Sequence, residues 1–244
     1  MMTTKSVIAK RNDLINASYS LSIAETRVIL ICLSKIKPKI PLALDHEFTV
    51  TARDFDDELG ISSNSAYENL QSAVDKLWSR SILIDPNEPK SMVRWITKKA
   101  TFKSSSSINI AFSPQIIPYL TELSARFTTY KIKDVAKFSN AYSLRVYELL
   151  VQFKGSNERK ISVLDFRAML DLREKYTAIK DLKKRVLTPA LADINDHSNI
   201  NVKLFQEREG REISHFIFKY NITESKPTKA NGSKQLIPRF FEPA

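Results

Sequence analysis

The chain has 244 residues, and its 43% hydrophobic and 9% aromatic content is typical of a folded protein rather than a disordered one. Lys and Arg outnumber Asp and Glu by 38 to 27, and the net charge of +11 indicates a polyanionic partner, either nucleic acid or an anionic membrane surface. No apolar run approaches the roughly 20 residues of a membrane span, and the first residues contain no apolar signal segment. We therefore expect a cytoplasmic protein without a membrane partner.

Glycine, histidine and cysteine are too sparse for the common catalytic motifs. The chain has 4 glycines, which form neither a G-x-x-x-x-G-K-[ST] nor a G-x-G-x-x-G phosphate loop. Its 3 histidines stand isolated from one another and from the single cysteine, so local spacing offers no metal site. The sequence therefore predicts that the protein is not an enzyme and has no cofactor and no metal ion.

The first half of the chain predicts a helix-turn-helix followed by a hairpin. An apolar helix over residues 22–36 is followed by a strand over 47–51 and a helix over 53–59 that ends at Gly60. The carboxylates at 54–58 lie in the first turns of that helix, where offsetting the helix dipole is a better interpretation than binding Mg²⁺. A second helix runs from the serine-rich caps at 62–65 to about residue 79. Alternating residues over 92–103 and 108–112 predict a β-hairpin, which completes a winged-helix pattern.

The second half repeats these signals in the same order. Residues 50–61 and 161–172 share Asp-Phe and a later Leu at a constant offset of 111 residues, which indicates an internal duplication. Helices are predicted over 141–153 and 179–195, and strands over 199–205 and 213–220. The fold class is therefore α+β, with two tandem winged-helix domains. The predicted divisions are an N-terminal arm (1–19), domain 1 (20–120), domain 2 (121–222) and a mobile C-terminal tail (223–244).

The second helix-turn-helix carries the more basic helix. Residues 121–244 have a net charge of +8 against +3 for residues 1–120. A helical wheel from Ile179 places Lys184, Arg185 and Thr188 outward, where Lys and Arg donate to guanine edges, so these three are predicted to read DNA bases. Pro189 predicts a bend in this helix. Contacts to the DNA backbone are predicted for Lys180, Lys183 and Asn195; the alternative is a solvated basic face.

The matching helix of the first half has a mixed-sign face, with Glu68, Gln71, Asp75 and Lys76 outward. It is therefore better suited to contact at its ends than to lying deep among phosphates. For each basic residue named next, an ordinary exposed surface charge is an equally good interpretation. Backbone contacts are predicted for Arg53, Ser63 and Asn64 near the turn, for Lys98, Lys99 and Lys103 in the first hairpin, and for Arg208 and Arg211 in the second.

Four stretches of the chain resemble the initiator replication proteins of iteron-containing plasmids, the family of the F-plasmid initiator. The resemblance covers most of residues 11–220. The stretches are residues 12–22 (NDLINASYSLS), 118–120 with 126–128 (PYL and RFT), 140–148 (NAYSLRVYE), and 181–185 with 194–195 (DLKKR and IN).

This resemblance implies a fold of two winged-helix modules and a function in plasmid replication and copy control. Such proteins bind repeated origin sites, called iterons, as monomers, open the origin, and recruit the host initiator ATPase and the replicative helicase. As dimers, many repress their own gene at an inverted repeat, and chaperones are further expected partners. The resemblance assigns major-groove reading to Lys183, Lys184 and Arg185, and phosphate contact and dimerisation to the first module.

Two alternatives to the initiator stay open at this point. A dedicated winged-helix transcriptional repressor has the same DNA-binding parts without replication activity. A nuclease or nickase requires a catalytic set that the sequence does not contain. In the tail, Gln235, Leu236, Phe240 and Phe241 resemble peptides that dock on a sliding clamp; the alternative is an apolar tail that folds back on the domain.

Overall fold

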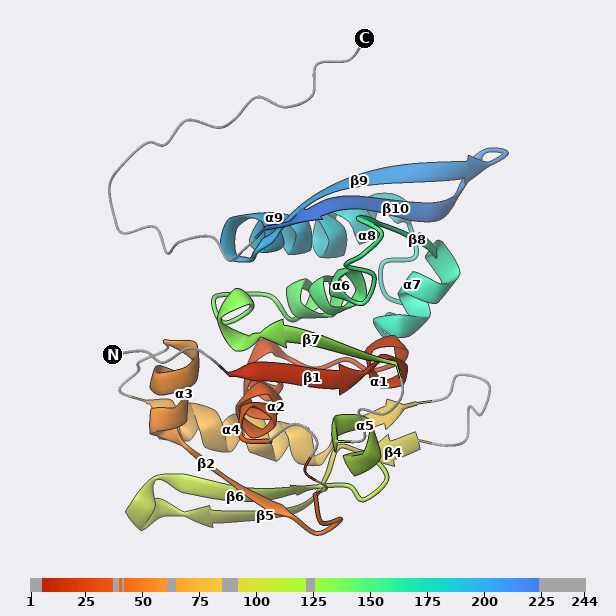
Figure 1. Ribbon diagram of the computed structural model, residues 1–244. Helices are drawn as coiled ribbons and strands as arrows, with labels where there is room; N and C mark the ends of the chain where they lie inside the picture. Colours follow the sequence, from red (N-terminus) through yellow and green to blue (C-terminus); the bar gives the residue numbers. More distant parts are fainter. Residues whose placement is uncertain are drawn as a thin grey trace.

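A two-stranded ribbon lies at the middle of the molecule (Figure 1). The structure is a computed structural model that describes residues 6–36, 40, 42–60, 65–84, 92–121 and 126–223. Strand β1 (Val7–Arg11) is antiparallel to β7 (Phe127–Lys131), with Ile8 opposite Tyr130. Each strand begins one half of the chain, so the ribbon pairs equivalent parts of the duplicated plan.

The first half packs its helices between this ribbon and a three-stranded sheet. Helix α2 begins after a capping box of Ser22 and Glu25, and α3 begins after one of Thr51 and Asp54. Gly60 ends α3 in the left-handed conformation, at φ 64°. The elements are α1 (Asn12–Asn16), α2 (Ile23–Ser34), β2 (Glu47–Thr51), α3 (Ala52–Leu59), α4 (Ala66–Trp78), β3 (Ser81–Leu83), β4 (Met92–Arg94), β5 (Ile96–Phe102), η1 (Lys103–Ser105), β6 (Ser107–Phe112) and α5 (Ile117–Thr121).

The second half repeats this arrangement on the other side of the ribbon (Figure 1). Its sheet has the order β8-β10-β9 and that of the first half has the order β2-β6-β5, so in both the strand before the helix-turn-helix pairs with the last hairpin strand. This confirms two winged-helix units. The elements are η2 (Ile132–Asp134), α6 (Ala141–Val151), β8 (Glu158–Ser162), α7 (Val163–Met169), α8 (Ile179–Leu182), η3 (Lys183–Leu187), α9 (Thr188–His197), β9 (Ile200–Glu209) and β10 (Glu212–Ile222).

Two features of the fold differ from the sequence analysis, and one is not tested. Residues 7–19 do not form an arm: Ile8, Leu14 and Tyr19 are buried in the core. The strand expected over 92–103 divides at Trp95, which is fully buried, because β4 pairs with β3 while β5 pairs with β6. The predicted tail lies outside the described residues, apart from Thr223. In the described part of the chain, no helix is long and apolar enough to cross a membrane.

A buried polar cluster joins the two halves behind the ribbon. Glu148 of α6 is fully buried and accepts from Lys10 Nζ of β1 at 2.6 Å and from the Tyr130 hydroxyl of β7 at 2.5 Å. Arg145 donates to the Tyr19 hydroxyl at 2.5 Å, to the Ala17 carbonyl at 2.9 Å and to the Met169 carbonyl at 2.9 Å. The buried Glu148 carboxylate is thus paired with the Lys10 ammonium and lies 3.6 Å from the Arg145 guanidinium. Buried charges are tolerated in a protein interior only when they are paired and hydrogen-bonded in this way.

Candidate nucleic-acid interface

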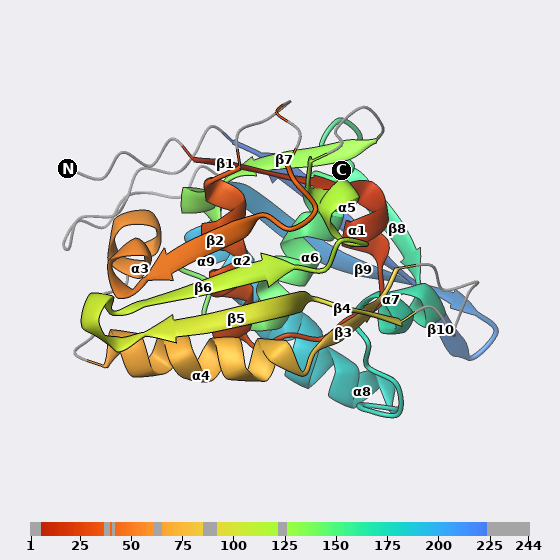
Figure 2. The same ribbon diagram turned by 90° about the horizontal axis from the view of Figure 1, so that it is seen from below.

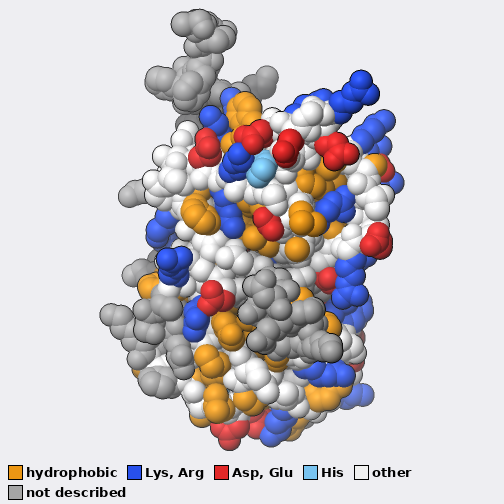
Figure 3. Space-filling view, turned by 90° about the vertical axis from the view of Figure 1, so that its right-hand side faces the viewer, with side chains coloured by type: hydrophobic (Ala, Val, Ile, Leu, Met, Phe, Trp, Pro, Cys, Tyr) orange, Lys and Arg blue, Asp and Glu red, His pale blue; other side chains and the backbone are white. Residues whose placement is uncertain are grey.

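Helices α4 and α8 lie on the same side of the molecule. Both occupy the lower edge of the view from below in Figure 2. Figure 3 looks at the right-hand side of Figure 1, and its right-hand margin, which is this same side, carries many Lys and Arg side chains from top to bottom. The second helices of the two helix-turn-helix units are thus presented together on one basic side.

The second-half helix is continuous over residues 179–197 but changes geometry in its middle. Residues 183–187 form a π turn, and the Thr188 N–H donates to the Lys183 carbonyl. Pro189, the second residue of α9, has no N–H for the Arg185 carbonyl, and a wide turn directly before it accommodates that missing bond. The π turn lies just before Pro189, and the bend predicted there stays a prediction.

The residues predicted to read bases are on the outer face of this helix. Lys184, Arg185 and Thr188 are exposed, while Leu182, Val186 and Ala190 are fully buried on the opposite face. Lys180 is exposed as well, and Lys183 is partly buried. Among the residues that the structure describes, none forms an ion pair with Lys184 or Arg185, so both charges are available to a ligand.

Asn195 bonds to the strand beside its helix. Its amide nitrogen donates to the Val202 carbonyl at 3.1 Å, and its amide oxygen accepts from the Val202 N–H at 2.7 Å. Both polar atoms therefore tie α9 to strand β9. A helical wheel contains no information about the strand that packs beside the helix, and the contact of Asn195 to the DNA backbone stays a prediction.

Helix α4 has a different charge pattern. Glu68, Asp75 and Lys76 are all exposed, as the sequence predicts. Lys99 of β5 forms an ion pair with Asp75 at 2.6 Å, and its Nζ lies 5.7 Å from the centre of the Trp78 ring. Lys98 instead pairs with Glu47 at 2.5 Å. Because side chains alternate along a strand, these two lysines serve opposite faces of the sheet and do not form one basic patch.

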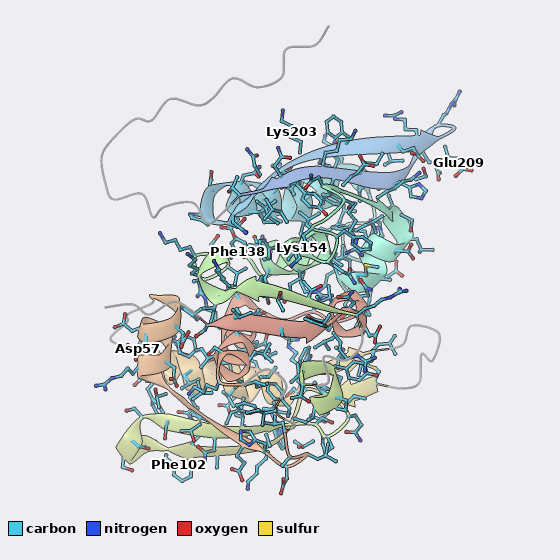
Figure 4. All side chains as sticks on the ribbon, in the orientation of Figure 1. Asp57, Phe102, Phe138, Lys154, Lys203 and Glu209 are labelled. Carbon is cyan, nitrogen blue, oxygen red and sulfur yellow. The ribbon has the colours of Figure 1, made fainter. Side chains whose placement is uncertain are left out.

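The tips of the two hairpins carry the remaining basic candidates. Arg208 and Arg211 are exposed on either side of the β9–β10 turn, where Figure 4 labels Glu209, and Gly210 adopts φ 62°. Lys103 is exposed beside Phe102, which Figure 4 labels at the β5–β6 end. Arg53 is exposed on α3, whereas Ser63 and Asn64 lie outside the described residues.

Asp54, the first acidic residue of α3, serves as a structural group. Asp54 accepts from the Thr51 N–H at 2.6 Å and pairs with Lys35 at 2.9 Å, so it caps the helix. Across the described ranges, no group of three His, Cys, Asp or Glu side chains is arranged to hold a metal ion.

Comparison with known proteins places this arrangement in a family. Residues 7–151 match the family described as "Initiator Replication protein, WH1", and residues 162–220 match "Initiator Rep protein, WH2". The chain belongs to the initiator replication protein family. This confirms the resemblance seen in the sequence and the two winged-helix units. The first match ends at residue 151 and the second begins at residue 162, so neither match has a boundary at the predicted division between residues 120 and 121, which stays a prediction.

Individual known proteins are similar over most of the chain. A "Replication initiation protein" of Escherichia coli is 32% identical over 246 residues, covering 93% of this chain and 76% of that one. An "Uncharacterized 27.6 kDa protein" of Escherichia coli is 26% identical, covering 91% of this chain and 98% of that one. The structure of the Pi initiator protein in complex with iteron DNA superposes with a TM-score of 0.77 at 24% identity, covering 91% of this chain and 99% of that one.

Proposed function

We propose that this initiator binds directly repeated sites at a plasmid origin as a monomer and so starts replication. The observation that carries the proposal is the basic outer face of the 179–197 helix, whose Lys184 and Arg185 have no ion-pair partner among the described residues, on the same side as α4. Two second helices on one side suit successive major-groove faces of a duplex, and one chain then covers roughly 20 base pairs. The iteron complex of the similarly folded Pi initiator supports this mode of binding.

The roles of single residues follow from their positions. Lys184, Arg185 and Thr188 are proposed to read bases, with Lys180 and Lys183 on the adjacent phosphates. Arg208 and Arg211 are proposed to bind the DNA backbone next to the site of the second-half helix. Arg53 and Lys103 are proposed to bind the DNA backbone next to α4. Contacts by Ser63 and Asn64, and by the tail residues Gln235, Leu236, Phe240 and Phe241 on a sliding clamp, are proposed from the sequence alone.

The remaining proposals concern partners. As a dimer, the protein is proposed to repress its own gene at an inverted repeat. At the origin it recruits the host initiator ATPase and replicative helicase, with chaperones controlling the balance of monomer and dimer. It carries out these roles in the bacterial cytoplasm, without catalysis of its own.

A footprint on the DNA flanking its own gene, at two salt concentrations, tests the proposal. Protected direct repeats of roughly 20 base pairs are the expected result, with affinity that falls steeply as salt rises. Protection of an inverted repeat alone would favour the dedicated repressor. Protection near 10 base pairs would contradict binding by both units of one chain.

A further inference from the structure

The turn that leads into the 179–197 helix is strained. Within residues 171–178, three residues other than glycine have a positive φ: Asp171 at 48°, Arg173 at 44° and Tyr176 at 54°. Side chains with a Cβ disfavour this region, so such a run persists only where surrounding contacts define the backbone. A strained segment directly before a DNA-binding helix requires an anchor.

Arg167 of α7 provides that anchor. Its Nη1 donates to the Lys175 carbonyl at 3.0 Å, and its Nη2 donates to the Tyr176 carbonyl and, at 3.0 Å, to the Thr177 carbonyl. One guanidinium thus holds three consecutive carbonyls that precede the first turn of α8. The planar fork of arginine donates to several acceptors in a fixed geometry, which lysine cannot reproduce.

The side chain of Tyr176 is partly buried against the core, as is that of Tyr142. Burial, followed by the neighbouring Tyr176, raises the pKa of Tyr142 to about 12. Tyr142 belongs to α6, whose core position is fixed by the polar cluster of Arg145 and Glu148. The turn is therefore held at its backbone by Arg167, and one of its side chains lies beside α6.

In the first half, the position equivalent to Arg167 does not hold an arginine. At the 111-residue offset of the duplication, Arg167 corresponds to Asp56, which is exposed on α3. The anchor therefore belongs to the half whose helix carries the basic outer face. This distribution links the anchor to DNA reading rather than to the winged-helix fold as such.

The geometry points to Arg167 as a positioning residue for sequence-specific DNA binding: it holds the 171–178 turn so that Lys184 and Arg185 meet the base edges. This role rests on the proposed function. Arg167 acts through the backbone and does not touch DNA. Base contacts depend on sub-ångström placement of donors, whereas phosphate contacts tolerate displacement, so loss of the anchor affects the specific part of binding.

The test compares Arg167→Ala, Arg167→Lys and the matched control Arg173→Ala. Arg173 lies in the same turn with 71% of its side chain exposed and pairs with Asp171 at 2.9 Å. Anisotropy titrations use a 30-base-pair duplex with one footprinted repeat and a scrambled duplex of equal composition, at three NaCl concentrations. Hydrogen exchange of free protein reports on residues 171–182.

We expect Arg167→Ala to bind the repeat duplex at least tenfold more weakly and the scrambled duplex within twofold of wild type, with an unchanged salt slope and faster exchange over 171–182. Arg167→Lys should fall in between, and it carries the test if the alanine variant does not fold. Arg173→Ala should weaken both duplexes by one common factor, because it removes charge without removing the anchor.

Three outcomes would overturn the inference. Equal loss on both duplexes with a reduced salt slope would make Arg167 a phosphate contact, and unchanged affinity for the repeat would deny it any role. Unchanged hydrogen exchange over 171–182 in Arg167→Ala would show that Arg167 does not anchor the turn, and would leave the proposed function untouched. A wild-type protein that binds both duplexes equally would instead overturn the proposed function, and this role with it.

Discussion

The two halves have the same strand order and the same helix-turn-helix plan, yet the first presents a mixed-sign helix and the second a basic helix on the same side of the molecule. Helix α4 exposes Glu68 and Asp75, and Asp75 is engaged by Lys99. The 179–197 helix exposes Lys184 and Arg185 without ion-pair partners among the described residues. Duplication thus preserved the buried positions, which packing constrains, while the outer faces diverged.

A second comparison concerns two ion pairs of equal length. Lys10 and Glu148 lie 2.6 Å apart at the junction of the halves, with 3% and 0% of their side chains exposed. Lys160 and Glu207 lie 2.6 Å apart on the outer face of the second sheet, with 46% and 44% exposed. Water screens the second pair but not the first, so equal geometry does not imply equal contributions to stability.

Removal of Glu148 should have the largest effect on the protein. Glu148→Ala leaves the Lys10 ammonium and the Tyr130 hydroxyl buried without their acceptor. We expect the free energy of unfolding, measured by urea denaturation, to fall by about 3–5 kcal/mol. Glu207→Ala is the matched control and should change it little. Similar losses in the two variants would contradict the role assigned to burial.

The difference between the two helices is tested next. Lys184→Ala and Arg185→Ala should each weaken binding to a footprinted repeat by about 1–3 kcal/mol, with less loss on scrambled DNA. Lys99→Ala should reduce both affinities by a similar and smaller factor. Titration of the two duplexes with each variant measures this, and equal loss on both for all three variants would refute base reading by the second half.

Alkaline pH should weaken the junction. Burial, with Glu148 as the next cause, holds the pKa of Tyr130 well above its ordinary value of 10. The unfolded chain therefore loses this proton at lower pH than the folded chain, so stability is unaffected below about pH 10 and falls above it. Urea denaturation from pH 8.5 to 11 measures the decline. Tyr130→Phe should make the decline shallower, and an unaltered pH dependence would assign it to other groups.

The smallest expected effect comes from the acidic face of α4. Asp75→Asn removes a negative charge and releases Lys99, so affinity for scrambled DNA at low salt should rise about two- to threefold. Asp57→Asn makes the same charge change on α3, where Figure 4 labels Asp57, but leaves the Asp75–Lys99 ion pair intact, so it should raise affinity less. An equal rise in both variants would show that net charge alone matters.

Local periodicity was enough to predict much of this protein from its sequence. The helix-turn-helix units, their hairpins and the outward position of Lys184 and Arg185 follow from spacing within single elements, because a helix or strand fixes which residues share a face. The family resemblance supplied the functional hypothesis from four short stretches. Both depend on information that lies close together in the chain.

Long-range contacts decided the rest. The burial of Lys10 depends on a carboxylate 138 residues away, and β1 becomes part of the core because β7 is its partner. Asn195 bonds to a strand, and Arg167 anchors a turn that begins beyond its own helix. No pattern within one element reports such pairs, since the energy of a buried charge or an unpaired strand edge is set by what tertiary packing brings against it.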